Sequence, residues 1–428
     1  ESARTEKNEF TNRYIWTNSW CAPSGGMNMV NGFCQRDGSF VTNFFYAQPA
    51  LNYGFAKPDP AHPWQMPMNH PDCLATRQAL KDIIRFWLDM GADGYRVDMA
   101  PSLIRNDPEK KAIKKLWHDV IGMIKRDYPD AIMISEWFNN VQAVDSGFDV
   151  DFAGIFSFSA HQKLFRAEKK ANVHFMAKTK DFGNEGHSFF RKAGKGDASE
   201  YIRQMTDTLS KIRRKGFVGF YTSNHDITRI NVDRTQEELE LVFAFVLTMP
   251  GVPFIYYGDE IGMRYMGELP SKEGGYTRTG SRTPMQWSEG KNAGFSSAAE
   301  GRLYLPVDKT KGRPTVAAQE KNPDSLLNGV RRLTTLRHEL PALNADSDFT
   351  PLYVKKNAYP LVFLRSKGNA KAVVAINPSG RKVKAAFTAA QIKTVRRMLL
   401  GKNVKLEKSG SRFSLEMSPV SYAIFDCE

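Results

Sequence analysis

Three acidic residues each follow directly after an apolar run of the chain. Asp98 follows Tyr-Arg-Val, Glu136 follows Ile-Met-Ile-Ser, and Asp226 follows a run that ends in Ser-Asn-His. Short apolar runs of this kind predict buried strands. In parallel α/β folds the carboxyl ends of the strands form the active face. We therefore expect the three acids to converge at one face of a sheet.

Converging carboxylates suit the cleavage of an acetal with retention of configuration. One carboxylate attacks the anomeric carbon, and a second, kept protonated, donates to the leaving oxygen, with the pair about 5 Å apart. Arg96 precedes Asp98 by two residues, so it points to the same side of the strand, where its charge favours ionised Asp98. Glu136 precedes Trp137 and Phe138, and such apolar surroundings favour a raised pKa for acid catalysis.

The remaining acid forms a His-Asp pair. His225 could donate hydrogen bonds to sugar hydroxyls, with Asp226 stabilising positive charge on the ring. Each feature alone also has a structural interpretation, because an Asp at a strand end often caps the next helix and a His-Asp pair can form a turn. The joint pattern favours function.

Alternating helices and apolar strands must position these residues. Apolar residues recur at helical spacing before the first acid, and Asp107 and Pro108 open a further helix. Alternation of this kind predicts a parallel sheet with covered faces. The expected strands cover residues 94–98, 131–134, 217–222 and 252–257, and the expected helices include 79–88, 236–249 and 325–339.

The two ends of the chain have a different character. Residues 1–70 are rich in Asn, Gly, Pro and aromatic residues without a sustained period, which predicts irregular structure. Residues 341–428 contain short alternating runs that predict an all-β domain. The central residues 71–340 carry the βα units.

Composition excludes several classes. With 428 residues, 41% hydrophobic and 25% charged, the chain fits a globular protein of more than one domain. The net charge of +14 is scattered over polar helix faces without a recognised nucleic-acid module, so we expect no nucleic-acid partner. The longest apolar stretch, residues 241–257, is interrupted by prolines and glycine, so we expect no membrane span. A bridge between Cys21 and Cys34 would require an oxidising compartment.

Three segments of the chain resemble those of a known family. The segment ADGYRVD at 92–98, Glu136 and the segment NHD at 224–226 resemble, in order and spacing, the second, third and fourth signature regions of the α-amylase family. The resemblance implies Asp98 as nucleophile, Glu136 as acid/base and Asp226 as transition-state stabiliser. It also implies that Arg96, His225 and Arg229 bind substrate.

Supporting matches cover nearly the whole chain. Residues 48–52 are similar to the fifth signature region, and residues 258–263 to the segment after the eighth barrel strand. Residues 13–16 and 282–287 are similar to segments of the oligo-1,6-glucosidase and trehalose synthase branch. The resemblance implies a (β/α)8 TIM barrel with domain B and the connection back to the barrel at 1–70, the remaining barrel units at 71–340 and a C-terminal β-sandwich at 341–428.

Departures from the family pattern bear on specificity and completeness. Ala50 stands where the branch usually carries Asp, Ile227 replaces a common Gln, and Met99 matches neither frequent residue after the nucleophile. The linkage preference therefore stays open between α-1,4 and α-1,6. The expected strands are too few to close an eight-stranded barrel, and the first signature region is missing, so we predict a further N-terminal part in the natural protein.

The sequence predicts a retaining α-glycoside hydrolase that acts on α-glucosidic bonds of short oligosaccharides. One alternative is a transglycosylating or isomerising enzyme that resembles trehalose synthase. Another is a non-catalytic, glucosidase-like subunit that binds a ligand or associates with a membrane transporter. No organic cofactor is expected, because the acid, the nucleophile and water suffice. The family resemblance allows a bound Ca²⁺, but no ligands can be assigned. Bacterial cytoplasm and periplasm both stay open as locations.

Overall fold

The computed structural model describes residues 1–31, 34–154, 160–168, 186–213 and 215–428. The chain divides into two compact units, Glu1–Asp151 and Phe152–Glu428. Each unit has its own hydrophobic clusters and its own candidate site residues.

The first unit begins with the irregular segment that the composition predicts. Its regular structure is a short antiparallel pair, β1 (Met29–Asn31) and β2 (Ser39–Val41). A small cluster of buried side chains holds the segment together: Ile15, Val41, Ala50, Phe55 and Trp64. The segment is therefore folded around its own core although it contains little secondary structure.

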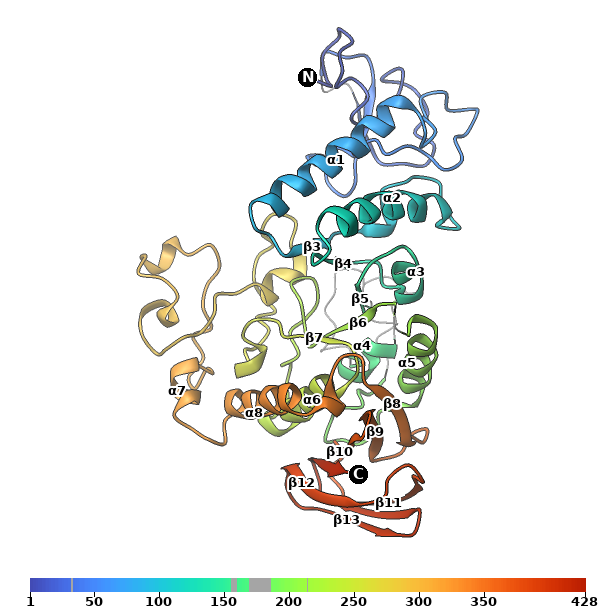
Figure 1. Cartoon of the computed structure of the whole chain (residues 1–428). Helices are drawn as coiled ribbons and strands as arrows, with labels where there is room; N and C mark the ends of the chain where they lie inside the picture. The colour runs from blue at the N-terminus through green and yellow to red at the C-terminus, as the bar shows by residue number, and fades with distance from the viewer. Residues whose placement is uncertain (32–33, 155–159, 169–185, 214) are drawn as a thin grey trace. The chain divides into compact units, whose positions relative to one another are not determined.

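The rest of the first unit alternates helices with parallel strands (Figure 1). The elements are α1 (Pro71–Asp89), β3 (Gly94–Val97), the 3-10 helix η1 (Ala100–Ser102), α2 (Lys111–Asp127), β4 (Ile132–Ser135), α3 (Asn140–Asp145) and β5 (Val150–Phe152). Strands β3, β4 and β5 pair in parallel in that order. The expected βα units are present.

Helix α2 shows how the sequence produces this layer. Ile113, Leu116, Val120 and Ile124 lie three or four residues apart, on one face of the helix, and all are fully buried. They belong to one cluster with Met133 of β4, so burial of this face covers the parallel strands.

The second unit contains further helices and parallel strands. Its helices are α4 (Ala160–Phe165), α5 (Ser199–Ile212), α6 (Gln236–Thr248), α7 (Val316–Glu320) and α8 (Leu326–Glu339). Its parallel strands are β6 (Phe217–Tyr221) and β7 (Val252–Phe254). Short 3-10 helices follow in the connections: η5 (Asp259–Ile261), η6 (Tyr276–Ser281), η7 (Lys291–Gly294), η8 (Glu300–Arg302) and η9 (Pro341–Leu343).

Helix α6 is the buried centre of this unit. Thr235 and Glu238 form a reciprocal capping box at its N-terminus. Beyond the first turn nearly every side chain of the helix is buried, as its almost continuous apolar sequence requires. At its C-terminal end, Arg337 of α8 donates to the carbonyl oxygens of Leu247 and Met249 at 2.7 and 2.9 Å. These contacts satisfy carbonyl groups that a helix end leaves without partners.

The C-terminal strands form the predicted β-sandwich. They are β8 (Asp348–Tyr353), β9 (Leu361–Lys367), β10 (Ala370–Asn377), β11 (Val383–Thr388), β12 (Val395–Gly401), β13 (Val404–Ser409), β14 (Arg412–Met417) and β15 (Ser421–Cys427). One antiparallel sheet has the order β12-β15-β10-β9-β8 and the other β11-β14-β13. In β14 exposed and buried residues alternate strictly, so Phe413, Leu415 and Met417 face the shared core.

Polar contacts attach the sandwich to the helices of the same unit. Arg365 of β9 is fully buried and donates to the carbonyl oxygens of Thr248 and Asn344. Tyr359 stacks on Phe189, with ring centroids 4.9 Å apart. Because the Arg365 guanidinium is buried and bonded to backbone carbonyls, its loss would leave unsatisfied polar atoms at the junction.

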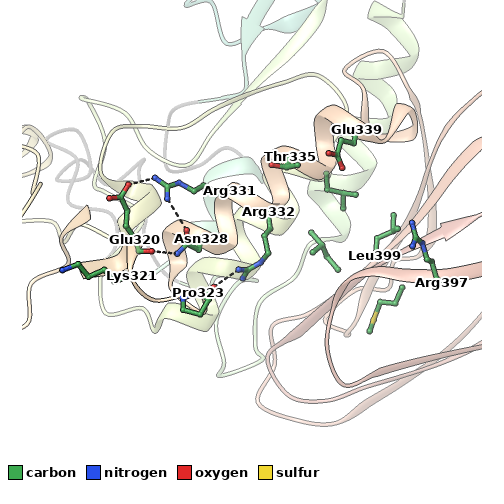
Figure 2. Close-up of a pocket in the computed structure, with 13 residues that line it drawn as sticks. Glu320, Lys321, Pro323, Asn328, Arg331, Arg332, Thr335, Glu339, Arg397 and Leu399 are labelled. Carbon is green, nitrogen blue, oxygen red and sulfur yellow. Dashed lines mark hydrogen bonds and ion pairs between the residues drawn. The ribbon is translucent and has the colours of Figure 1, made fainter. Parts of the chain in front are cut away.

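A surface pocket of about 720 Å³ lies between α7, α8 and β12. Figure 2 shows Arg331 reaching both Glu320 and Asn328, while Arg332 reaches the carbonyl oxygen of Pro323. The pocket contains none of the predicted site residues.

The sequence raised the question of a disulfide bridge and predicted no membrane span, and both points can be compared with the described residues. Cys21 and Cys34 are free thiols, so the bridge considered for an oxidising compartment is absent from the structure. None of the described helices combines the length and the hydropathy that crossing a bilayer requires.

Candidate functional site

The first pair of predicted acids meets because two parallel strands end in register. Val97 of β3 pairs with Ser135 of β4, so Asp98 and Glu136 are the next residues at the same edge. The backbone N–H of Glu136 donates to the carbonyl oxygen of Val97 at 2.9 Å, which extends the strand pairing up to the acid. Gly94 permits this close packing, because a Cβ atom there would lie 2.0 Å from the carbonyl oxygen of Ile132.

A single guanidinium contacts both acids. Nη1 of Arg96 lies 2.5 Å from Oδ1 of Asp98, and Nη2 lies 2.8 Å from Oε2 of Glu136. The carboxylates differ in their surroundings, since the side chain of Asp98 is 68% exposed and that of Glu136 only 8%. The structure therefore brings three predicted site residues together, with one carboxylate in solvent and the other buried.

Burial raises the pKa of Glu136 from 4.5 to about 7, since desolvation disfavours the charged form. A hydrogen bond with Asp98 and the negative charge of that residue raise the pKa further. The backbone N–H of Met99 and the charge of Arg96 act in the opposite direction and only partly offset the burial. Glu136 is therefore half protonated near neutral pH, as the apolar sequence around it predicts.

The turn after Asp98 supplies a second ligand for Glu136. Met99 adopts a left-handed conformation, with φ 44° and ψ 41°, immediately before η1. This turn aims its backbone N–H at Oε2 of Glu136, 3.1 Å away. A left-handed conformation is uncommon for a residue other than glycine and costs about 1 to 2 kcal/mol, so the surrounding contacts must stabilise it.

A pocket of about 470 Å³ adjoins Asp98 within the first unit. One side is formed by the turn after Asp98, and the other by the segment that resembles the fifth signature region. Arg105 donates to Oδ1 of Asn43 at 2.6 Å and so joins the two sides. The lining residues are Asn43, Phe44, Gln48, Pro49, Leu51, Tyr53, Asp98, Met99, Ser102, Leu103 and Arg105. Ala50, which replaces the usual Asp of the branch, is buried in the core beside this pocket segment.

The second unit carries His225 and Asp226 in the loop after β6. The side chain of Asn224 organises this loop, because its Oδ1 accepts from the backbone N–H groups of Asp226 and Ile227 at 2.8 and 3.0 Å. Two residues that follow an Asn are thereby held in a tight turn. The turn fixes the direction in which the predicted stabiliser leaves the strand end.

Three basic groups surround Asp226. Arg278 and Arg282 contact its Oδ1 at 2.9 and 3.1 Å, and Nε2 of His225 lies 3.3 Å from Oδ2. Arg282 also donates to the carbonyl oxygen of His225 at 2.9 Å. The two arginines come from η6 and the residue after it, more than fifty positions along the chain from the acid. Asp226 therefore has basic partners at both carboxylate oxygens.

Arg229 has a different environment from the other predicted binding residues. Its side chain is fully buried, and Nη1 contacts Oδ1 of Asp259 at 3.1 Å and the carbonyl oxygen of Tyr257 at 2.7 Å. Asp259 is also fully buried. The role of Arg229 in substrate binding stays a prediction, while its contacts link the loop after β6 to the segment after β7.

Sequence reasoning missed several members of the site. Arg278 and Arg282 lie in or beside a segment matched to the family, but nothing local to that segment indicates that their partner is Asp226. Asp151, the middle residue of the three-residue strand β5, was missed as well. The convergence of Asp226 with Asp98 and Glu136 stays a prediction, as do the catalytic roles.

The described part of the chain contains no evident metal centre. No group of three or more His, Cys, Asp or Glu side chains is placed there to hold a metal ion. The Ca²⁺ that the family resemblance allows stays a prediction, and no chemical step is derived through it.

The covered parallel strands, the acids at their carboxyl ends and the C-terminal sandwich define an α/β protein with a carboxylate site. The family described as alpha amylase, catalytic domain, matches residues 65–346, and the chain belongs to this family. The trehalose synthase/amylase of Mycolicibacterium smegmatis is 29% identical over 326 residues, which cover 69% of the chain and 49% of that relative. The salivary alpha-glucosidase of Aedes aegypti is 24% identical over 394 residues, 78% of the chain and 60% of that protein. The chain thus spans about half the length of curated relatives that it matches.

Solved structures support the fold. The isomaltulose synthase from Erwinia rhapontici NX5 matches with a TM-score of 0.72 and 20% identity, over 100% of this chain and 79% of that one. The alpha-amylase from H.orenii matches with a TM-score of 0.69 and 20% identity, over 100% of this chain and 76% of that one. Together with the family, these structures confirm the predicted (β/α)8 barrel class with a C-terminal antiparallel sandwich.

Proposed function

We propose that the protein is a retaining α-glycoside hydrolase for α-glucosidic bonds of short oligosaccharides. Asp98 is the nucleophile, Glu136 the acid/base and Asp226 the stabiliser of the transition state. The observation that carries this proposal is the contact of one guanidinium, Arg96, with an exposed and a buried carboxylate. Since one planar group touches both, the two carboxyl groups lie close together, which supports a retaining mechanism.

The different surroundings of the two acids support these roles. Glu136, whose pKa is raised to about 7, carries a proton at neutral pH and donates it to the leaving oxygen. Asp98 attacks the anomeric carbon as the bond to that oxygen breaks, giving a covalent glycosyl ester. Glu136, now ionised, takes a proton from water, the water oxygen attacks the anomeric carbon, and Asp98 is released. Acid, nucleophile and water suffice, so we propose no organic cofactor.

A transglycosylating variant of this activity is the second candidate. Trehalose synthases of Mycolicibacterium smegmatis and Pimelobacter are among the relatives, at 29% and 27% identity. The same covalent intermediate forms a new glycosidic bond when a sugar hydroxyl replaces water. Chromatography of the products from maltose separates the two, because formation of only glucose excludes the transferase.

The test combines product analysis with trapping of the intermediate. The full-length protein is incubated with maltose, isomaltose and maltooligosaccharides beside Asp98→Asn and Glu136→Gln variants, and we expect both variants to lose the release of reducing sugar. Asp93→Asn is the matched control, because Asp93 is an exposed acid at the other end of the same strand. A fluorinated glucosyl fluoride should add one glycosyl mass to the peptide that contains Asp98. A folded wild type that is inert on every α-glucoside would refute the proposal.

A further inference from the structure

A second buried carboxylate lies behind the candidate acid/base. Asp151, in β5, is fully buried and belongs to the first unit, as Glu136 does. Strand β5 pairs in parallel with β4, and Ser135 stands opposite Asp151 in the register. The strand that leads to Glu136 and the strand that carries Asp151 are therefore hydrogen-bonded neighbours.

The carboxylate of Asp151 accepts hydrogen bonds from both sides of Glu136. Its Oδ1 lies 2.7 Å from Oγ of Ser135, the residue before Glu136, and 3.0 Å from the backbone nitrogen of Trp137, the residue after it. The backbone N–H of Phe138 reaches the same oxygen at 3.3 Å. One oxygen atom thus gathers three donors from four consecutive residues around the acid/base.

The second oxygen fixes the start of the following helix. The side-chain amide of Asn140 donates to Oδ2 of Asp151 at 3.0 Å and to the backbone carbonyl oxygen of Asp151 at 2.9 Å. Between these anchored points Phe138 adopts a left-handed conformation with φ 61°. A residue with a Cβ rarely holds this conformation unless its surroundings stabilise it, and here the anchoring carboxylate provides that stabilisation.

We propose that Asp151 is the positioning residue for the acid/base, because it fixes the backbone on both sides of Glu136 and so aims the carboxyl group toward Arg96 and Asp98. This inference rests on the proposed function. The charged groups in contact with Glu136 are Arg96 and Asp98, and both reach it from β3 or the turn after it. Asp151 acts from the opposite strand and touches no reacting atom, so its effect passes through the geometry of Glu136.

A nearby acid offers a matched control. Asp149 also bonds to β4, accepting from the backbone N–H of Met133 at 2.8 Å and from Lys125 at 2.9 Å. These contacts hold β4 before Glu136 and do not bracket it. Asp149→Asn therefore removes a carboxylate of the same neighbourhood, bonded to the same strand, while the anchors on either side of Glu136 stay in place.

The kinetic experiment compares two substrates whose leaving groups differ. Maltose needs proton donation to its leaving sugar, whereas 2,4-dinitrophenyl α-glucoside releases a stable anion without it. For Asp151→Asn we expect kcat/KM on maltose to fall by about 10- to 100-fold and on the aryl glucoside by less than about threefold, since acid catalysis contributes about 10²- to 10⁴-fold. Asp149→Asn should reduce the two substrates equally. Equal losses for Asp151→Asn would contradict the positioning role.

A spectroscopic measurement separates this inference from the proposed function. Protein labelled with ¹³C at glutamate carboxyl carbons is titrated by NMR, and the Glu136 signal is assigned from its absence in Glu136→Gln. We expect Asp151→Asn to lower the midpoint of Glu136 by about one pH unit, because a displaced carboxyl group is better solvated. An unchanged midpoint overturns the inference even in an active enzyme. A lowered midpoint in a protein inert on all α-glucosides supports it while the proposed function fails.

A milder variant tests the same inference if Asp151→Asn does not fold. Ser135→Ala removes the 2.7 Å hydrogen bond to Oδ1, together with a longer contact of 3.4 Å to the carbonyl oxygen of Val150, and leaves the carboxylate in place. We again expect a larger loss on maltose than on the aryl glucoside. Because the lost donor is a neutral hydroxyl, kcat/KM on maltose should fall by about 3- to 10-fold. A loss that is equal for both substrates would count against the positioning role.

Discussion

The raised pKa of Glu136 predicts the pH dependence of the reaction. The perturbation is a rise in pH from 5 to 9, with maltose as substrate and kcat/KM as the measured quantity. Since the acid must be protonated in the free enzyme, kcat/KM should be high at acidic pH and fall with a midpoint near 7, the pKa that burial gives Glu136. Above the midpoint we expect a tenfold fall for each pH unit.

The magnitude follows from comparing the buried acid with an ordinary glutamate. At pH 7 a carboxyl group with a pKa of about 7 is protonated in about half of the molecules, and one with the usual 4.5 in about 0.3%. Burial therefore raises the fraction of competent enzyme at neutral pH by about 150-fold. At 1.36 kcal/mol for each pH unit, the difference corresponds to roughly 3 kcal/mol.

The assay measures initial rates on maltose and on 2,4-dinitrophenyl α-glucoside in buffers of constant ionic strength. The decrease above pH 7 should be pronounced for maltose and weak for the aryl glucoside, because the aryl group leaves without a proton. A maltose midpoint of 5.5 or lower, or a flat profile up to pH 9, would refute the assignment of Glu136 as a buried acid.

Three further predictions concern stability and the second unit. The pKa of Glu136 is higher in the folded protein than in the unfolded chain, so the wild type should lose roughly 3 kcal/mol of unfolding free energy between about pH 4.5 and 7. Glu136→Gln should avoid this loss. The same pH dependence of the unfolding free energy for the two proteins, measured by urea denaturation, would contradict the prediction. Arg278→Met removes one of the arginines on Asp226 and should lower kcat/KM by about 10-fold or more without a comparable loss of stability, and rates within twofold of wild type would argue against it. Asp259→Asn leaves the buried Arg229 without its ionic partner and should cost about 3 to 5 kcal/mol in urea denaturation, whereas a cost below about 1 kcal/mol would exclude a supporting role for this pair.

Local sequence patterns predicted the elements that carry the first pair of acids. The apolar runs before Asp98 and Glu136 form β3 and β4, and the expected helix after Asp107 becomes α2. Arg96, two positions before Asp98, points to the same side and contacts it, as strand periodicity requires. These features depend on period and burial, which a sequence encodes locally.

Contacts between distant segments could not be predicted in the same way. Nothing near Arg278 or Arg282 indicates that both contact Asp226, since the pairing depends on how η6 folds back across the unit. The role of Asp151 depends on the register of β5 against β4, and β5 has only three residues, too few to show a period. Short strands and long-range ion pairs are specified by the whole fold, which explains why these residues were missed.

The same arginine contacts two acids of similar chemistry, so their surroundings, and not this shared partner, distinguish them. Arg96 contacts both, yet the side chain of Glu136 is 8% exposed and that of Asp98 is 68% exposed. At the exposed acid the carboxylate contacts both the guanidinium and solvent. At the buried acid, desolvation outweighs the same guanidinium and leaves the pKa at about 7. Under the proposed function, depth below the surface is therefore the variable that would separate the acid from the nucleophile.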